Sequence, residues 1–321
     1  MLRLSGKLLC VMVLFGGVVC AQTSQLTEDQ ALSAINLATN PSTKLAAAEE
    51  FINRFPKSSS RLKAAELVAA EILKIKNGTV AIALVERAQS IFTLDEEREV
   101  LKPVALEAYA TGNRPKDAFK LAEELLAKDP NDIYVLVQMT QAGADEVRKR
   151  NREHAEIALQ YGTKAIALIE AGTKPPKVDD ATWATYTASL GQLYQQTAIL
   201  YLGTGNTAEA KARLTKATTA SPYDPSNYAL LGRVIHAEYV KEMEAFDKLP
   251  DSKQKQETRK RLDGVLDTII EAYAQAAGLA LNRPEYQQLM QQVIPDLTNY
   301  YKYRNKDSTK GLKELINKYR R

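Results

Sequence analysis

The residues that most often carry enzyme chemistry are few in this chain. It has two histidines, His154 and His236, and two cysteines, Cys10 and Cys20. A metal site or an activated nucleophile needs several such groups side by side, and the two histidines are far apart in the sequence. The sequence also lacks the nucleophile-elbow, phosphate-loop and His-Glu-x-x-His patterns. We therefore expect no catalytic residue, no metal site and no cofactor.

Residues that could bind a partner must be positioned by helices, and one stretch shows how. Tyr201–Gly232 contains two segments with apolar residues at helical spacing, which meet at a Gly-Asn turn around Gly205 and are followed by Pro222. Proline lacks a backbone N–H and stops the second segment. Tyr194 and Tyr228 stand at equivalent points 34 residues apart, so the pattern repeats.

Small and bulky residues fall in this stretch where two packed antiparallel helices require them. Ala198 and Ala210 are small enough for the helices to cross closely, and Gly232 takes the role of Ala198 one repeat later. Three bulky residues, Tyr201, Leu214 and Leu231, surround the crossing. Ala217 is the small residue on the back of the second helix.

This spacing resembles the tetratricopeptide repeat, although Thr197 stands where the family has leucine. Residues 48–65 also resemble the start of periplasmic proteins of this family, such as the outer-membrane assembly lipoproteins and the Tol-Pal-associated division factor. Phe55-Pro56-Lys57-Ser58 matches the joint between their repeats. The resemblance implies an all-α fold, an α-solenoid of about seven antiparallel helix pairs in a right-handed superhelix. The matching positions are Tyr194, Ala198, Tyr201, Ala210, Leu214, Ala217, Pro222, Tyr228, Leu231 and Gly232.

In the resembled family, the first helix of each pair lines a concave groove that binds a partner. The groove implied here is mostly neutral and rich in glutamine, whose amide both donates and accepts hydrogen bonds. Such a lining suits an extended or helical peptide better than a polyanion. The same residues could equally be solvated surface. The positions carried over as partner-binding are Gln192, Gln195, Ile199, Arg233, His236, Gln287 and Gln291, and a further register on Leu136 adds Tyr134, Val137, Gln141 and Ala144.

The first residues have the layout of a secretory signal peptide. Arg3 and Lys7 precede an apolar run over residues 8–19, which is short for a membrane span. We expect cleavage before Gln22, giving residues 1–21 as the signal peptide and a periplasmic or secreted chain. The alternative is a lipoprotein anchored through Cys20. Both cysteines lie in this leader, so the mature chain would depend on packing rather than on disulfides.

Composition limits the remaining choices. Hydrophobic residues make up 45% and charged residues 26%, which is ordinary for a soluble chain, and a net charge of +4 gives no reason to expect nucleic acid. We expect no transmembrane helix in the mature chain. Peripheral membrane association is left open by the basic clusters in residues 253–261 and 302–306, although acidic residues are interspersed.

The helical pattern is interrupted once by a proline-rich segment. We expect repeats over residues 22–171, a connector over 172–180 that contains Pro175-Pro176, and repeats with a capping helix over 181–321. Asp179 should cap one long helix over residues 181–202.

Two functions fit this sequence. The first is an exported scaffold of the bacterial cell envelope that binds a protein or peptide segment in its groove. The second is a carbohydrate-binding component of an outer-membrane uptake system. It would use exposed aromatic residues, and Trp183 and twelve of the fifteen tyrosines lie after residue 180.

Overall fold

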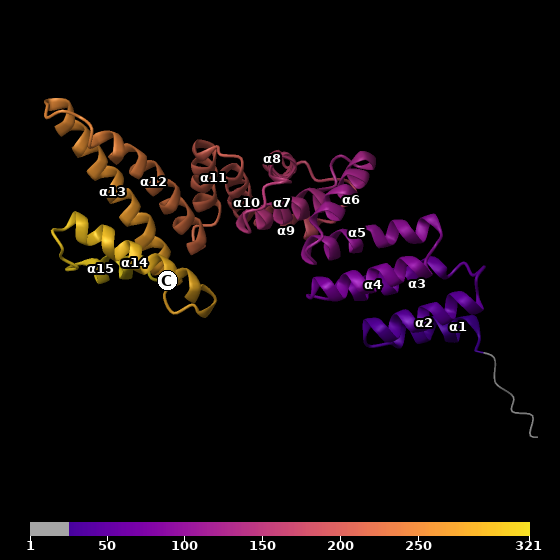
Figure 1. Ribbon diagram of the computed structural model, residues 1–321. Helices are drawn as coiled ribbons and strands as arrows, with labels where there is room; N and C mark the ends of the chain where they lie inside the picture. Colours follow the sequence, from indigo (N-terminus) through magenta and orange to yellow (C-terminus); the bar gives the residue numbers. More distant parts are fainter. Residues whose placement is uncertain (1–25) are drawn as a thin grey trace, which may run out of the picture.

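The computed structural model describes residues 26–321, and in that range it contains fifteen α-helices and no strand (Figure 1). The predicted signal peptide over residues 1–21 lies outside the described residues. The helices are α1 (Glu28–Leu37), α2 (Pro41–Arg54), α3 (Arg61–Ile72), α4 (Gly78–Ile91), α5 (Asp95–Thr111), α6 (Pro115–Lys128), α7 (Ile133–Arg148), α8 (Ala155–Glu170), α9 (Asp180–Ala188), α10 (Leu190–Gly203), α11 (Thr207–Ala220), α12 (Pro225–Phe246), α13 (Lys253–Ala280), α14 (Gln287–Arg304) and α15 (Leu312–Lys318), and a 3₁₀ turn over Pro284–Tyr286 precedes α14.

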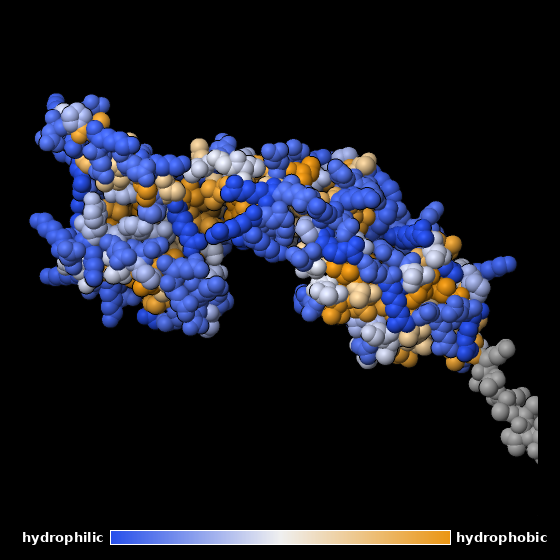
Figure 2. All heavy atoms as spheres, in the orientation of Figure 1, coloured by the Kyte–Doolittle hydropathy of each residue, from blue (hydrophilic) through white to orange (hydrophobic). Residues whose placement is uncertain are grey.

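The helices pack in neighbouring pairs along an elongated, arched stack (Figures 1 and 2). We call α1, α3, α5, α7, α10, α12 and α14 the first helices, and the helix that completes each pair its second helix. First helices of adjacent pairs contact one another, as α3 does with α5 and α7 with α10, while second helices contact the next first helix. The predicted all-α solenoid is confirmed, and α9 is an additional helix between the fourth and fifth pairs.

Polar caps begin many of these helices. Thr27 forms a capping box with Gln30, because each side chain accepts a hydrogen bond from the other residue's backbone N–H. The side chains of Asn40, Asn77 and Asp132 accept from backbone N–H groups in the first turns of α2, α4 and α7. Local sequence thus sets where these helices begin.

The crossing of α10 and α11 contains the small residues noted above. Ala198, Ala210 and Leu214 are fully buried in one cluster with Val234 of α12. Gly205 takes the left-handed conformation, with φ of 85°, at the turn between the two helices. The next close approach is at Gly232 of α12, where an added Cβ would lie 2.8 Å from the Tyr273 ring of α13. No side chain fits there without displacing that ring.

The single helix expected over residues 181–202 is wrong, because the chain turns at Ser189. Its ψ of 3° departs from helical geometry, and its hydroxyl donates to the Tyr186 carbonyl. The break separates α9, which has no buried residue, from the largely buried α10. Leu193 and Tyr194 of α10 continue one apolar cluster with Ile133 of α7, so the core extends across the connector over 172–180.

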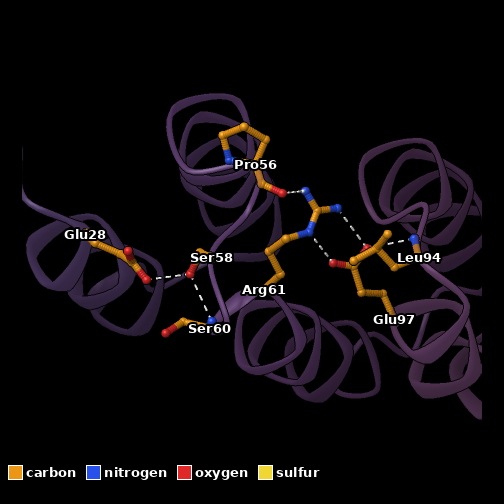
Figure 3. A network of polar contacts seen from close by, with 7 residues as sticks. All are labelled: Glu28, Pro56, Ser58, Ser60, Arg61, Leu94 and Glu97. Carbon is orange, nitrogen blue, oxygen red and sulfur yellow. Dashed lines mark hydrogen bonds and ion pairs between the residues drawn. The ribbon is translucent and has the colours of Figure 1, made fainter.

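A buried ion pair joins the beginnings of α3 and α5 (Figure 3). Arg61 Nε donates to Glu97 Oε1 at 2.6 Å, and Arg61 Nη2 donates to Oε2 at 3.0 Å. Arg61 is 7% exposed and Glu97 is 0% exposed. Backbone groups add one hydrogen bond to each partner: the Pro56 carbonyl accepts from Arg61 at 3.1 Å, and the Leu94 N–H donates to Glu97 at 3.0 Å. The pair is therefore bidentate and is also tied to the backbone on both sides.

A second contact joins α1 to the same region (Figure 3). Ser58 Oγ donates to the Glu28 carboxylate at 2.5 Å and accepts from the Ser60 N–H at 2.9 Å. Ser58 belongs to the joint between repeats that the sequence singled out. The first turns of three successive first helices are consequently tied together, which fixes the spacing of these repeats.

Candidate binding surface

The predicted contact residues on α10 differ in their accessibility. Gln192 is exposed, whereas Gln195 is 8% exposed and Ile199 is 5% exposed. Gln195 Nε2 donates to Asn227 Oδ1 of α12 at 2.7 Å, and Ile199 packs in the apolar cluster formed with α7 and α8. Gln195 and Ile199 therefore hold α10 against its neighbours, and their burial contradicts the prediction that they contact a partner.

Two predicted residues of α12, Arg233 and His236, contact α14, the helix that carries Gln287 and Gln291. Arg233 is exposed on α12 and donates to Gln292 Oε1 of α14 at 2.5 Å. The half-buried His236 ring lies 5.0 Å from the Tyr300 ring of α14, measured between centroids. Gln287 and Gln291 are exposed on α14. The structure thus brings a basic group and an amide together on adjacent first helices.

Glutamines from α7 and α10 meet at a hollow that α9 also borders. Gln192 Nε2 donates to Gln141 Oε1 at 3.4 Å, and Gln196 Nε2 donates to the same oxygen. Gln141 Nε2 donates to Asp145 Oδ2 at 2.7 Å. We call this hollow of about 210 Å³ the amide hollow; its lining is Val137, Gln138, Gln141, Thr185, Tyr186, Ser189, Gln192, Leu193 and Gln196.

Three of these lining residues, Val137, Gln141 and Gln192, were expected from the repeat register. The same register added Tyr134, which donates to Glu107 of α5 at 3.0 Å, and Ala144, which is fully buried. Gln196 was missed, although it follows Gln192 by four positions and shares its helix face. The residues from α9 could not be expected, because they depend on the turn at Ser189.

Burial affects the tyrosines of this region. Burial raises the pKa of Tyr186, which lines the amide hollow, and the Asp132 carboxylate adds to the effect. Burial, followed by the hydrogen bond from its hydroxyl to Glu170, raises the pKa of Tyr194 to about 12. Both rings serve the packing of the stack and keep their hydroxyl protons at neutral pH.

Most of the late aromatic residues are at least half-buried. Trp183 is half-buried against the cluster that contains Ile133 and Leu193. Tyr223 and Tyr303 are the exposed exceptions among the described residues, at 57% and 55%, and they lie on different elements. They form no shared aromatic shelf with Trp183.

Charged side chains, including those that could ligate a metal, are spread over residues 26–321. No group of three or more histidine, cysteine, aspartate or glutamate residues in that range could hold a metal ion. No helix in the same range is long and apolar enough to cross a membrane. Basic residues near the start of α13 and the end of α14 form ion pairs with acidic side chains. Arg259 pairs with Asp263, and Arg304 of α14 pairs with Asp267 of α13.

Comparison with known proteins adds no identification. No protein-family model matches the chain, and no curated protein matches it.

Proposed function

We propose that this chain is an exported, tetratricopeptide-like scaffold of the bacterial cell envelope that binds a segment of a partner protein along its first helices. The observation that carries the proposal is the amide hollow. There, Gln141 and Gln192 from successive first helices converge with Gln196 beside open solvent. Export rests on the sequence of the leader alone.

A peptide segment suits this surface for a chemical reason. Peptide backbone presents alternating N–H and C=O groups, and exposed glutamines such as Gln192, Gln287 and Gln291 can pair with either. The surface also needs little ordering on binding, because α7 and α10 are fixed by buried contacts, including the Gln195–Asn227 bond between α10 and α12. A rigid surface lowers the cost of association, so the partner segment bears most of it.

Carbohydrate binding is the second candidate. The exposed rings of Tyr223 and Tyr303 favour it, because sugars stack on exposed aromatic faces. The partial burial of Trp183 and of most late tyrosines favours the peptide, since a half-buried ring offers a sugar less of its face.

A matched pair of variants tests the proposal. In the full-length chain, Gln192→Trp places an indole ring at the amide hollow to fill it. Lys164→Trp places the same ring at an exposed position on the second helix α8. We expect affinity capture from envelope extracts to recover a discrete protein with the unaltered chain and with Lys164→Trp, and to lose it with Gln192→Trp. Equal recovery by all three chains, or retention on envelope glycan alone, would contradict the proposal.

A further inference from the structure

The hydrogen bonds of the amide hollow run in one direction. The Asp145 carboxylate can only accept, and it receives Arg148 Nη1 at 2.5 Å and Gln141 Nε2 at 2.7 Å. Because the Gln141 nitrogen must face Asp145, its oxygen faces the opposite way. Gln192 and Gln196 both approach that oxygen and must therefore present their nitrogens to it. Their own oxygens are left at the free end of the network.

The hydroxyl groups of the lining have the same polarity. Thr185 Oγ1 donates its proton to the Ala181 carbonyl at 3.1 Å, and Ser189 Oγ donates to the Tyr186 carbonyl at 2.8 Å. A hydroxyl has one proton, so these oxygens can only accept from a ligand. The hollow consequently presents acceptors from two glutamines, a threonine and a serine.

One of these acceptors lacks a hydrogen-bond partner among residues 26–321. Gln196 is 3% exposed, and its Oε1 is buried without a hydrogen bond. Buried polar atoms are nearly always paired, so an orphaned acceptor beside a hollow marks a place where a ligand donor would be stabilised. A donor reaches it once a neighbouring side chain moves, and the exposed Gln192, held by a 3.4 Å contact, is suited to do so.

We propose that the amide hollow binds the lysine or arginine side chain of a partner segment, an inference that rests on the proposed function. Ammonium and guanidinium groups carry several donors and no acceptor, which complements a lining of acceptors. The ring of Tyr186 adds a face on which a cation can rest. No lining residue is charged, and the nearby Asp145 and Arg148 neutralise each other, so no cation repels the ligand.

The dimensions and chemistry also disfavour competing ligands. A volume of about 210 Å³ is smaller than the roughly 300–1,000 Å³ of pockets for small organic ligands, and suits one side chain. An aspartate or glutamate carboxylate would place a further acceptor beside the unpaired Gln196 oxygen. A sugar hydroxyl can also donate to these oxygens, but it carries one donor proton where a guanidinium carries five.

Titration of the mature chain with small probes tests this inference. We would follow the side-chain amide NMR signals of Gln192 and Gln196 with N-acetyl-arginine amide and N-acetyl-lysine amide. The control is N-acetyl-citrulline amide, which has nearly the shape of the arginine probe but an uncharged, accepting ureido group. We expect saturable shifts with at least one cationic probe, and affinity about tenfold lower for citrulline, the loss typical of one hydrogen bond to a charged group.

Two variants complete the test. Gln196→Met removes the orphaned acceptor and should weaken the cationic probe about tenfold, whereas Lys164→Met should not change it. If Gln196→Met unfolds, Thr185→Val on the exposed α9 removes another acceptor and should weaken binding several-fold.

The outcomes separate this inference from the proposed function. Equal shifts with citrulline, stronger shifts with chitobiose, or no shift with any probe would overturn the cation site. Continued loss of the captured protein in Gln192→Trp would then leave the scaffold function standing. Cation-specific shifts without any captured protein would instead retain the site and remove the scaffold function.

Discussion

Substitution of Glu97 by glutamine should destabilise the N-terminal repeats strongly. The side chains of Arg61 and Glu97 are 8% and 0% exposed, so solvent screens their interaction little. Glu97→Gln removes the negative charge and turns an amide nitrogen toward a guanidinium that can only donate. Loss of one partner from a buried ion pair typically costs about 3–5 kcal/mol, because the other charge stays buried.

The assay is urea unfolding combined with hydrogen exchange in α3 and α5. Repeats interact mainly with their neighbours, so we expect the loss to appear first as faster exchange in these helices. The matched control is Glu49→Gln, which breaks a surface ion pair with Arg87. The Glu49 and Arg87 side chains are 48% and 44% exposed. That change should cost less than about 1 kcal/mol.

A double substitution separates the charge from the packing. Arg61→Met with Glu97→Leu removes both charges and keeps apolar volume, so it should recover most of the lost stability. If Glu97→Gln costs no more than Glu49→Gln, the account of this pair as a fixed joint between repeats is refuted.

Three other changes follow from the same packing. Gly232→Leu must displace the Tyr273 ring and should lower the free energy of unfolding by about 1–3 kcal/mol in urea titrations; an unchanged midpoint would contradict the assigned crossing. Asn77→Ala removes the side-chain cap from the Val80 N–H at 3.1 Å and should cost about 1 kcal/mol, whereas Asn77→Asp should cost little. The pKa of Tyr194 is raised from about 10 in the unfolded chain to about 12 in the folded chain. The protonated hydroxyl of Tyr194 therefore contributes fully to stability below pH 10, and this contribution is lost as the pH rises from about 10 to about 12. Tyr194→Phe should flatten that part of the alkaline unfolding curve, and an identical curve would show that the hydroxyl contributes nothing.

Local signals in the sequence were sufficient for much of the fold. Capping residues such as Thr27 and Asn77 lie next to the backbone that they satisfy, so the starts of their helices could be read directly. The pairing of helices followed from the spacing of small and bulky residues around Ala198. These features depend on neighbours within about one repeat.

The binding surface depended on contacts that a repeat register does not contain. Gln195 occupies a position that lines the groove in the resembled family, yet here Asn227 of α12 provides a polar partner that buries it. The turn at Ser189 inserts α9 beside α7 and α10, which creates the hollow and adds Thr185 and Tyr186 to its lining. Both outcomes are decided by the packing of neighbouring helices, which no short motif specifies.

Site-specific photo-crosslinking in intact envelopes tests the central claim, partner binding along the first helices, most directly. Photo-reactive residues at Gln192, Arg233 and Gln287 probe exposed positions on α10, α12 and α14, and Lys164 on the second helix α8 is the control. The account predicts one discrete protein adduct from the first-helix positions and none from Lys164. Adducts of equal yield from all four positions, or from Lys164 alone, would contradict it.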